Sequence, residues 1–96
     1  MKRNNTEQVG EVIRKLFRQE GLETPLNEYR LVESWGKVVG PVISKYTQNV
    51  FIKGQVLHVQ LKSSVLRNEL MMNRKMLVSH LNDAVGSQVI VDIMFH

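Results

Sequence analysis

Apolar residues in the first forty positions recur at the spacing of an α-helix. The pattern i, i+3, i+4, i+7 predicts a first helix over residues 9–17. A second helix is expected over residues 25–39. Thr24 can cap its start and Pro25 suits its first position, while Gly40 marks its end. The expected inner face of this second helix consists of Leu26, Tyr29, Val32, Trp35 and Val39.

The period of the pattern then changes from 3.6 to 2, which is typical of β-strands. A short helical turn is expected first, over residues 42–46. Residues 50–52 form a short predicted strand, and Gly54 lies in the turn after it. Over residues 57–62 apolar and polar side chains alternate, so one face of this strand is expected to be buried. The two strands together predict a β-hairpin.

One long helix and one strand complete the predicted fold. Ser63 or Ser64 can cap a helix over residues 65–85, and Gly86 suits its end. Residues 89–95 alternate again and predict a last strand. The predicted order is α-α-β-β-α-β. This order indicates a two-layer α+β fold, in which helices pack on one face of a three-stranded sheet.

The length and composition fit one small domain. We expect residues 1–5 to be loose and residues 6–96 to form that domain. The absence of cysteine excludes disulfide bonds and thiolate metal sites. No apolar run approaches the roughly 20 residues that a membrane-spanning helix needs, and no secretory signal is visible. A cytoplasmic protein that does not act at a membrane is therefore expected.

Positive charge is concentrated in the middle of the chain. The sequence has a net charge of +4, and no acidic residue occurs between Glu33 and Glu69. Segregated positive charge attracts polyanions, and a helix start offers free N–H groups to phosphate. In the alternative interpretation Ser63 and Ser64 only cap the predicted helix over residues 65–85, and the basic side chains are ordinary solvated residues. The candidate nucleic-acid-binding residues are Lys37, Lys45, Lys53, Lys62, Ser63, Ser64 and Arg67.

A second candidate surface lies in the middle of the predicted long helix. Met71, Met72 and Met76 cannot all face the same way as Leu70 and Leu77, so some of them are expected to be exposed. Flexible methionine side chains can form an adaptable surface for a protein partner. Filling of the core is the alternative role for some of them. The candidate partner-binding residues are Met71, Met72, Arg74 and Lys75.

No catalytic, metal-binding or cofactor-binding group is visible in the sequence. There is no P-loop and no nucleophile with an evident base, and His58, His80 and His96 are far apart along the chain. Trp35 could stack on a base, but its helical spacing indicates a core position. The few aromatic residues argue against an extended stacking platform. We therefore expect a binding protein without a small-molecule substrate, rather than an enzyme.

Several motifs follow one another in a fixed order over residues 9–95: Trp35, Val39-Gly40, residues 43–47, Phe51, Gly54, Leu57, Val59, Leu61, Ser63-Ser64, Glu69-Leu70, Leu77, Leu81-Asn82 and Gly86. This order resembles the bacterial family catalogued as domain of unknown function 721, which includes the DciA-like replicative-helicase operator proteins. The resemblance implies a K-homology (KH)-like fold, although the chain has no GxxG loop of the kind with which KH domains hold nucleic acid. It also implies DNA binding beside the replicative helicase at initiation.

The sequence thus favours a small nucleic-acid-binding accessory protein. DNA is the expected polymer, and the replicative helicase is the candidate protein partner. Two alternatives stay open. An RNA-binding module would prefer RNA to DNA of the same sequence, because the 2′-hydroxyl distinguishes them. A protein–protein adaptor would bind neither polymer.

Overall fold

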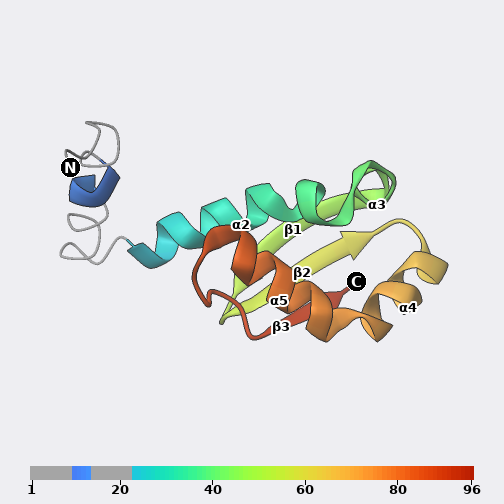
Figure 1. Cartoon of the computed structure of the whole chain (residues 1–96). Helices are drawn as coiled ribbons and strands as arrows, with labels where there is room; N and C mark the ends of the chain where they lie inside the picture. The colour runs from blue at the N-terminus through green and yellow to red at the C-terminus, as the bar shows by residue number, and fades with distance from the viewer. Residues whose placement is uncertain (1–9, 14–22) are drawn as a thin grey trace.

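The computed structural model describes residues 10–13 and 23–96 (Figure 1). Residues 10–13 are helical, and the rest of the first predicted helix lies outside the described residues, as does the predicted loose segment 1–5. The predicted α+β order is confirmed, with one predicted helix divided into two. The elements that follow are α2 (Glu23–Val39), α3 (Pro41–Tyr46), β1 (Thr47–Lys53), β2 (Val56–Leu61), α4 (Ser64–Met72), α5 (Arg74–Val85) and β3 (Asp92–Phe95).

The three strands form one mixed sheet with β2 in the centre. β1 pairs with β2 in the antiparallel direction, and β3 pairs with β2 in the parallel direction. The β1–β2 turn has positive φ angles at Gly54 (59°) and Gln55 (63°), as a type I′ hairpin turn requires. A parallel pair needs a crossover connection, and α4 and α5 supply it (Figure 1).

The helices cover one face of this sheet and form the second layer. Alternate strand residues point toward them, so Leu57, Val59 and Ile93 are almost completely buried. No polar or charged side chain is fully buried within the described ranges, so apolar burial supplies the stability of this core. The helices contribute Leu31, Trp35, Leu70, Leu77, Leu81 and Val85 to it.

The inner face of α2 differs from the prediction at its N-terminal end. Leu31 and Trp35 are buried, and Val38 packs beside them at the next helical turn. Tyr29 is 64% exposed, so its predicted inner position is wrong. Tyr29 lies two positions before Leu31, which puts it about 200° around the helix from the buried face. Thr24 does not cap α2, because the helix already begins one residue earlier.

The predicted long helix is broken at Asn73. This residue has φ −105° and ψ 17°, outside the helical range. Its side-chain amide donates to the Glu69 carbonyl (3.2 Å), and its backbone N–H donates to the Leu70 carbonyl (3.1 Å). An asparagine side chain that bonds a nearby carbonyl competes with helix continuation. Both Leu70 before the break and Leu77 after it are buried in the core.

The last strand is shorter than predicted and begins at Asp92. The segment before it bonds to a side chain of α5 instead of a neighbouring strand. The backbone N–H groups of Val89 and Ile90 donate to Asn82 Oδ1 (2.9 and 3.1 Å), and Asn82 Nδ2 donates to the Ile90 carbonyl (2.9 Å). One amide thus satisfies three backbone groups, so residues 89 and 90 need no strand partner.

Candidate nucleic-acid interface

Three elements meet at one corner of the sheet: the end of α2, the short helix α3 and the beginning of β1 (Figure 1). Trp35, 3% exposed, anchors this corner, which confirms its predicted core position. Its indole N–H donates to Thr47 Oγ1 (3.1 Å), and this hydroxyl donates to the Ile43 carbonyl (2.8 Å). Because these bonds connect the three elements, they fix the backbone from which Lys37 and Lys45 extend into solvent.

The connection from β2 to α4 passes the same corner. The backbone N–H of Lys62 donates to the carbonyl of Tyr46, the last residue of α3 (3.0 Å). α4 begins two residues later, and Ser63 Oγ accepts a hydrogen bond from the Leu66 N–H (3.2 Å). Ser63 is therefore the N-cap, as predicted. The first turn of α4 follows directly on a residue that is bonded to α3.

Replacement of Ser63 by alanine should lower the free energy of unfolding by about 1 kcal/mol, because the Leu66 N–H loses its acceptor. Urea denaturation followed by the fluorescence of Trp35, the single tryptophan, measures this loss. The matched control is Ser64→Ala at the exposed first helical position, which should change stability by less than about 0.5 kcal/mol. Equal losses in the two variants would contradict the assignment of the cap.

The structure brings most of the predicted nucleic-acid-binding residues to this corner. Lys37 near the end of α2, Lys45 on α3 and Lys62 after β2 are exposed on the segments that meet at this corner, and Ser63 and Ser64 follow Lys62 at the start of α4. We call these five residues the basic corner. The strand pairing separates Lys53 from them. It lies at the other end of β1, about 20 Å from the start of that strand at ~3.4 Å per residue.

Arg67 lies one turn into α4 and differs from the lysines in its surroundings. The residue is partly buried, and its Nε–H has no hydrogen-bond partner among the described residues. A buried donor without a partner costs about 1–3 kcal/mol. The Nε end of the Arg67 guanidinium therefore lies against the protein. A charge reversal at Arg67 would disturb this packing, so this residue is a poor position for such an experiment.

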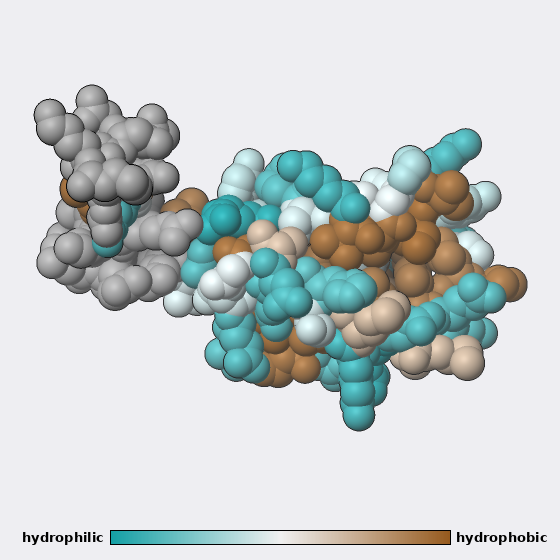
Figure 2. All heavy atoms as spheres, in the orientation of Figure 1, coloured by the Kyte–Doolittle hydropathy of each residue, from teal (hydrophilic) through white to brown (hydrophobic). Residues whose placement is uncertain are grey.

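The predicted partner-binding residues fall into two groups. Met71 and Met72 are exposed, Met72 to 86%, as expected for a surface role. Val65 lies seven residues before Met72 on the same face of α4, is also exposed and was missed. Figure 2 shows apolar atoms gathered toward the end of the molecule where α3 and α4 lie. The sequence signal for Val65 was its i, i+7 spacing to Met72, which is also compatible with a core face.

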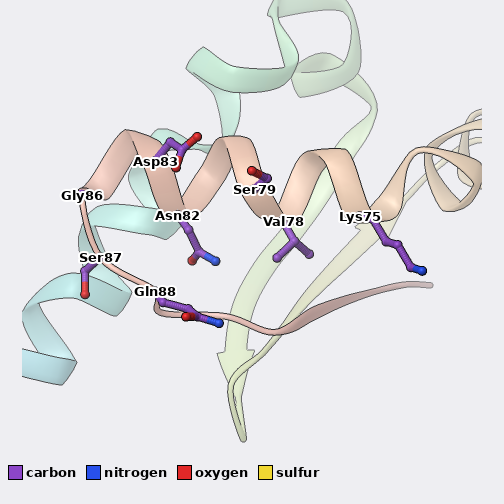
Figure 3. A pocket seen from close by; sticks show the side chains of 8 residues that line it. All are labelled: Lys75, Val78, Ser79, Asn82, Asp83, Gly86, Ser87 and Gln88. Carbon is purple, nitrogen blue, oxygen red and sulfur yellow. The ribbon is translucent and has the colours of Figure 1, made fainter.

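Arg74 and Lys75 lie at the start of α5, where Arg74 is partly buried and Lys75 is exposed. Arg74 Nε is 3.1 Å from Asp92 Oδ1, an ion pair that joins α5 to the first residue of β3. Lys75 extends at one end of a cleft of about 810 Å³ between α5 and the chain that follows it (Figure 3). Asn82 and Gln88 also line this cleft, and the amide of Asn82 is committed to backbone bonds. The described residues hold no cluster of metal-ligating side chains.

The other face of the sheet carries aromatic rings that the sequence analysis did not bring together. Phe51 of β1 stacks on His58 of β2, with 4.8 Å between ring centroids and 6° between ring planes. His58 in turn lies beside His96, with 5.3 Å between centroids and 9° between planes. The available signal was alternation: His58 lies on the polar side of β2, and the hairpin register puts Phe51 opposite it.

A family model described as Dna[CI] antecedent, DciA, matches residues 8–95, which include every strand and helix from α2 to β3. The chain belongs to the DciA family. This confirms the resemblance in the sequence, since the family model spans the same motifs. Among curated proteins no sequence matches significantly.

Membership of the DciA family implies an association with the loading of the replicative helicase. The family match covers both the basic corner and the exposed methionines of α4. None of the described helices is long and apolar enough to cross a membrane.

Proposed function

We propose that this DciA-family chain is an accessory of the bacterial replicative helicase that binds DNA through the basic corner. The observation that supports DNA binding is the hydrogen bond from Lys62 to the end of α3, which puts exposed Lys45 and Lys62 near the start of α4, within a sequence that has no carboxylate between Glu33 and Glu69. This role would place the protein in the cytoplasm, where the chromosome is replicated.

Binding at the basic corner would be electrostatic and independent of base sequence. The lysines act as point charges, and the N–H groups of the first turn of α4 can donate to phosphate oxygens. Ser63 Oγ occupies only the Leu66 N–H, so the cap leaves the N–H groups of Ser64 and Val65 for a phosphate. Lys53, far from the corner, would contact a different phosphate of a longer strand.

Fluorescence anisotropy of labelled single-stranded DNA, duplex DNA and RNA across a salt series tests this proposal. With ~3–5 phosphate contacts, the log–log slope of affinity against salt is expected to be roughly −2 to −4. Tighter binding of RNA than of matched DNA would favour the RNA-binding alternative. If no polymer binds at low salt, the nucleic-acid part of the proposal is wrong and the adaptor alternative gains support.

The exposed apolar surface of α4 is the proposed contact with the helicase. Val65, Met71 and Met72 present large apolar side chains to solvent, and such a surface next to charged residues is typical of a protein-binding site. Methionine side chains adapt to different partner surfaces. This surface lies on a different side of α4 from the buried Leu70, so a partner can bind without disturbing the core.

Met72→Glu should weaken the capture of purified replicative helicase by about tenfold or more, since a carboxylate would be buried against an apolar partner. The 86% exposure of Met72 means that the substitution should leave the fold unchanged. Ser79→Glu, which adds the same charge at an exposed position of α5, is the control and should bind normally. Unchanged capture by Met72→Glu would exclude this surface as the contact.

A further inference from the structure

The sheet face opposite the helices is open within the described part of the chain. Phe51, His58 and Met94 lie in register across β1, β2 and β3 and point away from the core. Phe51 is 43% exposed and Met94 is 50% exposed. An aromatic residue on a strand could bury its ring on the core side, whereas Phe51 lies between two inward-facing residues and remains partly exposed on the outer face.

The rings on this face are held in parallel planes. Phe51 and His58 are stacked, and His58 Nδ1 is 3.0 Å from His96 Nε2, so one imidazole N–H donates to the other ring. The backbone of His96 is also fixed, because its N–H donates to the Val59 carbonyl and its carbonyl accepts from the Leu61 N–H, both at 2.8 Å. The side chains are thus ordered before any ligand arrives, which lowers the entropy cost of binding.

The charges around the rings favour an anionic ligand. Lys53 and Asn49 are exposed at the outward positions of β1 on either side of Phe51, and Gln60 is exposed on β2. Among the strands of the described residues, Asp92 is the one carboxylate at an outward position, and Arg74 pairs with it at 3.1 Å. The stacked rings can contact flat rings of a ligand, and the lysine and the amide groups beside them can contact its negative charges. This combination suits a ligand in which flat rings and negative charges alternate.

We propose that this open face is a stacking platform for the bases of single-stranded nucleic acid, with Phe51 as its central contact and Lys53 on a neighbouring phosphate. His58 stacks on one face of the Phe51 ring, and in the proposed complex a base stacks on the opposite face. Duplex bases already stack on each other, so the platform selects single strands. The inference rests on the proposed function and adds to it the part of the polymer that this face would contact. It also specifies where Lys53, which lies far from the basic corner, would contact that strand.

The test compares Phe51→Leu, which removes the ring, with Phe51→Tyr, which keeps it. Each variant is titrated with an oligothymidylate and with an abasic oligomer of the same length, in buffer with EDTA so that no metal ion bridges the imidazoles. Loss of one stacked base predicts that Phe51→Leu binds oligothymidylate about tenfold more weakly. The tyrosine variant should bind like the unmodified chain, and the abasic oligomer should bind all variants equally.

The outcomes separate this inference from the proposed function. If oligothymidylate and the abasic oligomer bind the unmodified chain equally, or if Phe51→Leu binds normally, the stacking platform is wrong while salt-dependent binding at the basic corner still stands. If neither oligomer binds, both proposals fail. Circular dichroism of Phe51→Leu confirms that the variant is folded, and a loss of binding shared by both variants would point to the backbone of β1 instead of the ring.

Discussion

Replacing Asn82 by alanine should lower the free energy of unfolding by about 2–4 kcal/mol. The side-chain amide makes three hydrogen bonds to the backbone of Val89 and Ile90. Ile90 is fully buried, so the groups that lose Asn82 find little compensating water. A domain of this size has only about 5–15 kcal/mol of stability, so the loss is a large fraction. Thermal denaturation should show a drop in Tm of roughly 10–20 °C.

Asp83→Ala is the matched control, because Asp83 is the next residue of α5, is exposed and lines the same cleft (Figure 3). Its stability should change by less than about 0.5 kcal/mol. If Asn82→Ala were equally mild, water in the cleft would be replacing the amide, and the segment before β3 would not depend on Asn82. Hydrogen exchange at Ile90 distinguishes these cases, since its N–H should lose protection selectively in the variant.

The sequence predicts the elements of this fold because local pattern and tertiary burial agree over most of it. The alternation of Leu57, Val59 and Leu61 requires a half-buried strand, and these residues form the centre of the core. The break at Asn73 was not predictable from periodicity, because the apolar spacing of Leu70 and Leu77 also fits one continuous helix. It depends on which carbonyl the asparagine side chain finds, and this is decided only in the folded chain.

In the candidate sites too, the sequence predicts which residue types are present, but tertiary contacts decide which of them lie together. The clustering of Lys45 and Lys62 depends on a backbone bond between the end of α3 and the residue after β2, which no spacing rule predicts. Lys53 was grouped with them by sequence, whereas the direction of β1 takes it to the opposite end of the strand. The contact of His58 with His96 needs the parallel pairing of β2 and β3, a contact between segments 38 residues apart.

The double variant Lys45→Glu/Lys62→Glu should bind single-stranded DNA roughly 100-fold more weakly than the unmodified chain at about 50 mM salt. Both side chains are exposed, so their reversal leaves the core intact, which Arg67→Glu would not guarantee. Loss of two phosphate contacts should also make the log–log salt slope shallower by about 1.5. Anisotropy titrations over a salt series measure both quantities.

A change in net charge alone would also weaken binding, so the control must carry the same charge. Arg30→Glu/Lys75→Glu reverses two exposed basic residues on α2 and α5, outside the basic corner. If position matters, this control keeps the salt slope and loses only a few-fold in affinity, because distant surface charges are screened beyond about 10 Å at 0.1 M salt. If both double variants weaken binding equally, the chain attracts DNA through its overall charge and the basic corner is not a binding site.

A selective loss of binding in Lys45→Glu/Lys62→Glu would instead place phosphate at the start of α4, a short distance along the helix from the exposed methionines. DNA and a protein partner would then be held at neighbouring positions on one helix, so one accessory could contact both at the same time.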